Sequence, residues 1–157
     1  MDDFSHYDQD GSSRMVDISA KGVSSRYARA EGFVLMGVTT LGLIRDKLLP
    51  KGNVFEVAKI AGILAAKKTS DLIPLCHPLQ LNYVDVVITL EEDKGRLRIE
   101  SEIRLDGKTG AEMEALTAVS TAALTVYDMC KAVDKGMRIE GITLTEKRGG
   151  KSDFISK

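Results

Sequence analysis

The residues best suited to chemistry lie at the two ends of one uncharged stretch. A Glu-Met-Glu run at 112–114 precedes it, residues 115–127 carry no formal charge, and Asp128 and Lys131 follow. Residues three apart on a helix share a face, so Asp128 and Lys131 can touch. One interpretation is a surface ion pair worth a few tenths of a kcal/mol. The other is a lysine whose protonation is set by a carboxylate, as general acid–base catalysis requires.

The spacing of these groups limits how they can work together. Fourteen residues separate Glu114 from Asp128, which is about 21 Å along a helix axis. A single small ligand does not bridge that distance. If both ends serve one site, they come from two chains packed antiparallel, which predicts a symmetric oligomer with its active site across the interface.

A second candidate is the segment LIPLCHPL at 72–79, in which Pro74 and Pro78 flank Cys76 and His77. The prolines restrict the backbone, so a loop holds His77 in place. Alternatively, His77 is a structural histidine and Cys76 a small buried apolar residue. Adjacent Cys and His do not have the spacing of a structural zinc site, and the other cysteine is the distant Cys130.

Three single cations each have two interpretations. Lys51 stands between Pro50 and Gly52, just before an expected helix, where a lysine can meet a bound anion. Alternatively, it is a solvated loop lysine. Arg26 and Lys147 have the same two interpretations.

Two further segments, Gly107-Lys108-Thr109 and Gly150-Lys151-Ser152, resemble the end of a phosphate-binding loop. Neither has the glycine that such a loop requires five residues before its Gly-Lys pair. The segment at 107–109 is either a tight turn into the next helix or a helix N-terminus that offers N–H groups to an anion.

The composition excludes several classes of protein. The 157 residues carry a net charge of -1, with 43% hydrophobic and 29% charged residues, so one soluble globular domain is expected and a nucleic-acid coat is not. With 5% aromatic residues and no Trp, base stacking is also not expected. The polar N-terminus lacks a secretion signal, and the longest uncharged stretches are too short for a membrane helix. We expect a cytoplasmic protein with no membrane or nucleic-acid partner, comprising flexible tails at 1–14 and 149–157 and one domain at 15–148.

The patterning predicts strands and helices in a definite order. A strand is expected over 26–36, a helix capped by Thr39 or Thr40 that runs to Lys47, and a helix capped by Asn53 that runs to Lys68. Val57 is expected on the apolar stripe of that second helix. A hairpin over 83–90 and 96–105, a long helix over 111–133 and a strand over 138–145 follow. This order is typical of an α+β, ferredoxin-like plait, an antiparallel sheet with helices on one face.

The sequence closely resembles the MoaC family, the cyclic pyranopterin monophosphate synthases of molybdenum cofactor biosynthesis. The resemblance covers nearly the whole chain after the tail and rests on motifs in five places: MVDISAK at 15–21, KGNVF at 51–55, DLIPLCHPL at 71–79, the long run GKTGAEMEALTAVSTAALTVYDMCKAVDKGM at 107–137, and GGKS at 149–152.

The resemblance implies a reaction and a set of residues. The reaction is the rearrangement of 3′,8-cyclo-7,8-dihydro-GTP to cyclic pyranopterin monophosphate with release of diphosphate, which makes the protein a lyase. The family's catalytic group corresponds to Lys51, Asp128 and Lys131. Residues expected to bind substrate are Leu75, Cys76, His77, Glu112, Met113 and Glu114, and for the triphosphate Lys21, Arg26 and Lys147.

The resemblance also implies an assembly and a cofactor requirement. The expected assembly is a homohexamer, a trimer of dimers. No cofactor is required, although Mg²⁺ could accompany the triphosphate. The alternative function is a nucleotide-binding module of the same fold that does not turn its ligand over.

Overall fold

The structure, a computed structural model, describes residues 10–156. Residues 1–9 of the predicted N-terminal tail lie outside this range. The elements follow in the order β1 (Ser24–Leu35), α1 (Val38–Arg45), α2 (Val54–Lys67), α3 (Thr69–Leu72), β2 (Tyr83–Glu91), a 3₁₀ turn (Glu92–Lys94), β3 (Arg96–Gly107), α4 (Glu112–Cys130), β4 (Arg138–Arg148) and β5 (Phe154–Ile155).

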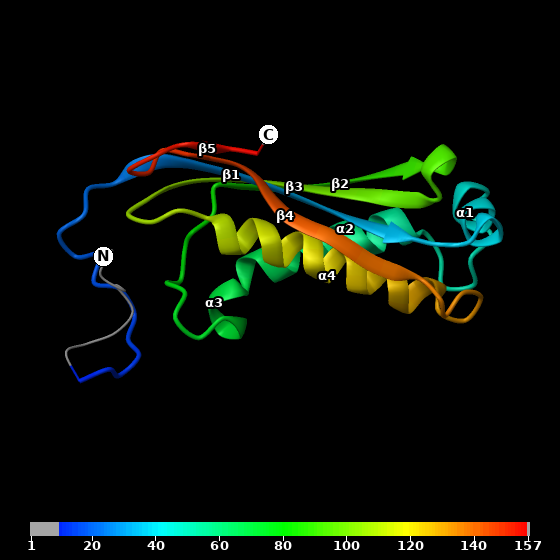
Figure 1. The fold of residues 1–157 in the computed structure, drawn as a ribbon, viewed down its shortest axis with the longest axis horizontal. Helices are drawn as coiled ribbons and strands as arrows, with labels where there is room; N and C mark the ends of the chain where they lie inside the picture. The colour runs from blue at the N-terminus through cyan, green and yellow to red at the C-terminus, as the bar shows by residue number, and fades with distance from the viewer. Residues whose placement is uncertain (1–9, 157) are drawn as a thin grey trace.

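The strands form one antiparallel sheet in the order β2-β3-β1-β4-β5. Helices α2 and α4 lie side by side beneath one face of this sheet (Figure 1). The predicted α+β class with helices on one face is therefore confirmed, and the finer assignment to a ferredoxin-like plait stays a prediction. Within the described residues, no helix is both long and apolar enough to cross a membrane.

The core lies between the sheet and the two long helices. Along β3, alternate residues are fully buried, including Leu97, Ile99 and Ile103, as expected for a strand with one face against helices. The buried face of α4 consists largely of alanines. At the crossing of α2 and α4, a side chain on Gly62 would place its Cβ 2.9 Å from the Ala118 carbonyl oxygen. Small residues therefore set the close approach of the two helices.

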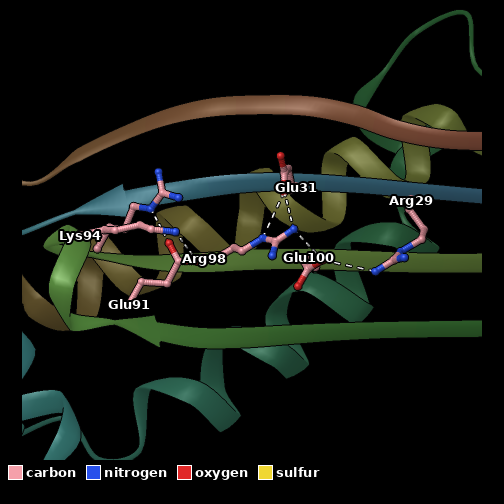
Figure 2. Close-up of polar contacts among 7 residues, drawn as sticks. Arg29, Glu31, Glu91, Lys94, Arg98 and Glu100 are labelled. Atoms are coloured by element: carbon pink, nitrogen blue, oxygen red, sulfur yellow. Dashed lines mark hydrogen bonds and ion pairs between the residues drawn. The ribbon is translucent and has the colours of Figure 1, made fainter. Parts of the chain in front are cut away.

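The other face of the sheet carries polar side chains that form ion pairs with one another. Arg98 forms ion pairs with Glu31 at 2.8 Å and with Glu100 at 3.2 Å, and Arg29 binds the same Glu100 at 3.3 Å (Figure 2). The guanidinium of Arg96 lies 3.8 Å above the centre of the Phe33 ring. This arrangement suits an antiparallel sheet that is covered by helices on one side only.

Several local predictions can now be compared with the structure. Asn53 caps α2 as predicted, since its side chain accepts hydrogen bonds from the N–H groups of Phe55 and Glu56. The predicted threonine cap of α1 is wrong: the cap position is Gly37, which has no side chain to offer. Instead, Asp134 accepts hydrogen bonds from the Gly37 N–H at 2.9 Å and from the Thr40 hydroxyl at 3.1 Å.

Three other local features differ from the predictions. Val57 was expected on the buried stripe of α2 but is 44% exposed, because α4 covers the neighbouring face of that helix. The short helix α3 and the two-residue strand β5, which pairs with Glu146 and Lys147, were not predicted.

Candidate active site

The C-terminal end of α4 carries a cluster of three charged side chains. The Asp128 carboxylate contacts the Lys131 ammonium at 2.7 Å and the Lys51 ammonium at 2.9 Å. Hydrogen bonds from Lys131 and then Lys51 lower the pKa of Asp128 to about 2, and the bond to Asp128 raises the pKa of Lys131. At neutral pH Asp128 is therefore an anion that holds a protonated Lys131.

Lys51 reaches this cluster from a loop 77 residues away in sequence. Gly52 has a φ of +96°, a left-handed conformation that favours glycine, and Asn53 then starts α2. The Lys51 ammonium also donates a hydrogen bond to the main-chain carbonyl of Asp128 at 3.0 Å. A cation at the C-terminal end of a helix binds carbonyls that have no partner within the helix. The loop between α1 and α2 and the end of α4 thus bring the Lys51 ammonium into contact with Asp128.

The N-terminal end of α4 borders a cavity of about 540 Å³. Its lining comes from the start of α4, the loop before β2 and the segment before β1, and includes Leu75, Cys76, His77, Glu112, Met113 and Glu114. The fold therefore brings together all six residues that the resemblance assigned to substrate binding outside the triphosphate. Val16, Ile18 and Ile73 also line the cavity and were not anticipated.

Glu114 is the buried carboxyl group of this cavity. It is only 4% exposed, and burial, followed by the nearby Glu112, raises its pKa to about 7. Burial and then the same two carboxyl groups raise the pKa of the Cys76 thiol. Cys76 is therefore a thiol at neutral pH and is poorly suited to nucleophilic attack.

His77 ties the proline-flanked loop to the segment before β1. Its Nε2 lies 2.7 Å from the main-chain carbonyl oxygen of Val16. A carbonyl only accepts hydrogen bonds, so Nε2 carries the proton and donates it. In the neutral ring Nδ1 is then an acceptor, which leaves it available to a ligand in the cavity.

A second cavity of about 540 Å³ adjoins the first, because both are lined by Lys21, Thr109, Gly110 and Glu112. The three cations expected to bind a triphosphate, Lys21, Arg26 and Lys147, all line it, and the Lys147 ammonium contacts the Glu112 carboxylate at 2.5 Å. Lys108 and Lys151 also line this cavity. Their association with glycine and a hydroxyl residue was visible in the sequence, but they were not selected as site residues.

The predicted residues therefore fall into two groups within one chain. The two cavities adjoin at the start of α4, and the Lys51–Asp128–Lys131 cluster lies at its far end. The fourteen residues of α4 from Glu114 to Asp128 separate the two groups by about 21 Å along the helix axis. Figure 1 shows the two ends of α4 at opposite ends of the sheet.

Comparison with known proteins identifies the family of this chain. The sequence profile of the MoaC family matches residues 15–150. The chain belongs to the MoaC family. It is also 57% identical over 152 residues to the cyclic pyranopterin monophosphate synthase of Heliobacterium modesticaldum (strain ATCC 51547 / Ice1), covering 97% of this chain and 96% of that protein. The range matched by the family profile contains the charged cluster and the residues that line both cavities, apart from Lys151 and Ser152 just beyond its end.

Proposed function

We propose that the protein is a cyclic pyranopterin monophosphate synthase of molybdenum cofactor biosynthesis, a lyase that converts 3′,8-cyclo-7,8-dihydro-GTP to cyclic pyranopterin monophosphate and diphosphate. The observation that carries this proposal is the 57% identity, over 97% of the chain, to a protein of that name. The adjoining apolar and cationic cavities suit a substrate that has a heterocycle at one end and phosphates at the other.

The reaction opens the purine-derived ring, builds a pterin fused to a pyran, and closes a cyclic phosphate. These steps are proton transfers and an intramolecular displacement at phosphorus, so no redox cofactor is required. In our proposal Lys131 moves protons at the base and sugar, with its pKa controlled by Asp128. Lys51 acts as an acid or binds phosphate.

Substrate binding is assigned to the two cavities. Glu114 faces the guanine-like edge, where a carboxyl group can bind N–H donors. Leu75, Cys76 and His77 line the same space. Lys21, Arg26 and Lys147 bind the triphosphate, which Mg²⁺ could accompany. The described residues contain no group of three His, Cys, Asp or Glu side chains placed to hold a metal ion.

Because the two groups of residues lie far apart within a single chain, we infer that a complete site needs two copies packed antiparallel. The outer surface of the helical layer suits this packing. It exposes Val57, Ile60 and Leu64 on α2 and Leu124 on α4. On α4, no formal charge lies between Glu114 and Asp128. Antiparallel pairing would bring the acidic start of one α4 to the lysines at the end of the other. The assembly proposed is a cytoplasmic hexamer, a trimer of dimers.

The test is a turnover assay with 3′,8-cyclo-7,8-dihydro-GTP that records diphosphate release and the mass of the organic product. The expected result is the release of one diphosphate for each cyclic pyranopterin monophosphate formed. Tight binding of the substrate without either product would instead favour the non-catalytic nucleotide-binding module. Lys131→Ala is expected to bind substrate and lose turnover, and unchanged turnover would remove Lys131 from the catalytic group.

A further inference from the structure

Asp134 joins the turn after α4 to the start of α1. Its Oδ2 atom accepts hydrogen bonds from the Gly37 N–H at 2.9 Å and from the hydroxyl of the buried Thr40 at 3.1 Å. Its Oδ1 atom accepts a third from the Gly136 N–H at 3.0 Å. These bonds, the one from Gly37 first, lower the pKa of Asp134, so it is an anion at neutral pH. Because hydrogen bonds to an anion are stronger than neutral ones, Asp134 is a firm link between the two elements.

The turn that carries Asp134 is tied to the end of α4. The Asp134 N–H donates a hydrogen bond to the Cys130 carbonyl at 3.0 Å. The Tyr127 hydroxyl donates one to the Lys135 carbonyl at 3.0 Å. Cys130 is fully buried, so the last residue of α4 is anchored in the core. Asp134 therefore keeps a fixed position relative to the helix end that carries the charged cluster.

Helix α1 ends in a defined conformation. Lys47 has a φ of +56°, in the left-handed region. The Leu48 N–H donates a hydrogen bond to the Leu43 carbonyl at 2.9 Å, and the Lys47 N–H donates one to the Ile44 carbonyl at 3.2 Å. Together these bonds make a Schellman motif, which satisfies the last carbonyls of a helix. The chain therefore leaves α1 in one direction.

The loop from this motif to Lys51 is short and closed. Leu49 is buried in the core, and the Gly52 N–H donates a hydrogen bond to the Leu49 carbonyl at 3.1 Å. Lys51 lies inside that turn. Within residues 37–52, which we call the α1 unit, the position of the Lys51 ammonium therefore depends on the position of α1.

The α1 unit meets the end of α4 at two places. At its start, Gly37 and Thr40 bind Asp134, and at its other end the Lys51 ammonium binds the Asp128 carboxylate at 2.9 Å. The Lys51 side chain is 46% exposed, and an exposed ion pair is too weak to hold a segment in place. Apolar packing holds α1 on the core but has no directional preference, whereas hydrogen bonds do. The bonds to Asp134 are therefore the contacts that fix the α1 unit relative to α4.

We propose that Asp134 is a positioning residue: by binding the start of α1, it places Lys51 on Asp128. The assignment rests on the proposed function, in which Lys51 acts as an acid or binds phosphate. Asp134 acts through α1 and is not itself placed at the reacting atoms. Because a misplacement of about 1 Å can lower a rate by about a hundredfold, a loosened α1 unit is expected to reduce turnover.

The competing explanation is that Asp134 only caps α1. The cap position of α1 is Gly37, which offers no side-chain hydrogen bond, and serine is among the residues preferred there. Gly37 has a φ of -68° and a ψ of 153°, which serine adopts, and a Cβ at this position would lie 3.5 Å from the Asp134 carboxylate, an ordinary contact. The double variant Asp134→Ala/Gly37→Ser therefore restores a cap to α1 without restoring its link to α4.

The experiment compares wild type, Asp134→Ala and the double variant by lysine labelling with acetic anhydride and mass spectrometry, without substrate. An ammonium bound to Asp128 must leave that carboxylate before its amine can react. Lys51 is expected to react about two- to fivefold faster in both variants, which is the size of effect that an exposed ion pair gives. Lys131 is the matched control, because it binds the same carboxylate from within α4 at 2.7 Å, and its labelling should not change.

Turnover and stability complete the comparison. Asp134→Ala is expected to lower the urea midpoint and to reduce kcat by roughly tenfold or more. KM should be nearly unchanged, because the residues assigned to substrate binding line the two cavities at the other end of α4. In the double variant the midpoint should recover and kcat should stay low. If Asp134→Ala does not fold, Asp134→Asn, which keeps one acceptor oxygen, replaces it.

The outcomes separate this proposal from the proposed function. Faster labelling of Lys51 in both variants supports the positioning role, whether or not the substrate is turned over. Wild-type labelling of Lys51 in Asp134→Ala, or the return of both wild-type labelling and wild-type kcat in the double variant, overturns it. Failure of the wild-type chain to release diphosphate would instead overturn the proposed function and leave the labelling result in force.

Discussion

Glu114 provides a test of how the first cavity controls charge. Burial raises its pKa from 4.5 to about 7, and each pKa unit corresponds to about 1.4 kcal/mol. Below pH 4.5 the carboxyl is protonated in both the folded and the unfolded chain, so it adds no pH dependence. Between pH 4.5 and 7 the unfolded chain ionises first, so the free energy of unfolding falls as the pH rises. Above pH 7 the folded chain carries the full penalty, about 3 kcal/mol.

The perturbation is Glu114→Gln, which keeps the shape of the side chain and removes its titration. Relative to wild type, the variant is expected to gain stability as the pH rises from 4.5 to 7.5, with a total change of about 3 kcal/mol. Urea unfolding followed by circular dichroism at several pH values measures this difference. The control is Glu56→Gln, an exposed carboxylate in the first turn of α2, for which no comparable change is expected.

The burial of Glu114 makes this test decisive. The side chain is 4% exposed, so solvent screening has little effect on it. If the difference between Glu114→Gln and wild type were the same at pH 5 and pH 8, the carboxyl would not be held in a desolvated position. The account of the cavity given above would then be wrong.

Three further predictions concern the cluster, the assembly and the helix packing. Asp128→Asn removes the contact that raises the pKa of Lys131, so the rise of activity with pH should shift to lower pH; an unchanged pH–rate profile would contradict this role. Lys131→Ala and His77→Ala should each be inactive alone. Refolded together in equal amounts, half of the dimers are mixed and hold one intact site of two, so about a quarter of wild-type activity should return; no recovery would contradict a site built from two copies. Gly62→Ala gains about 1 kcal/mol in helix propensity but places a Cβ 3.0 Å from a Val86 methyl and closer still to the Ala118 carbonyl, where overpacking costs about 1–3 kcal/mol. A lower urea midpoint is expected, and a higher one would show that the helices can separate without loss.

Sequence patterns predicted the elements that depend on local chemistry. Asn53 could be identified as a cap because its side chain binds N–H groups two and three residues ahead. The partner of Asp134 could not be identified in this way, because it binds Gly37, 97 residues away. Val57 was misassigned because the helical repeat does not distinguish the face of α2 against α4 from the face beside it.

The candidate site shows the same division. The Asp128–Lys131 contact followed from a three-residue spacing on one helix. The joining of Lys108 and Lys151 in one cavity depends on β1 lying between β3 and β4, which a reading of each motif by itself does not include. Two segments that are each incomplete as a phosphate-binding loop can therefore still line one cavity when the sheet brings them together.

The uninterrupted run of α4 between the two groups of site residues limits how this chain can change in length. Removing one residue from its 19 would turn everything beyond by about 100° and shorten the helix by about 1.5 Å. Asp128 would then leave Lys51, and the two ends of the helix would no longer match those of an antiparallel copy. The turn at Glu92–Lys94 joins β2 to β3 and contributes no residue to either cavity or to the charged cluster. Insertions and deletions should therefore be tolerated in that turn and eliminated by selection within α4. The length of α4 sets the distance between the two groups of site residues.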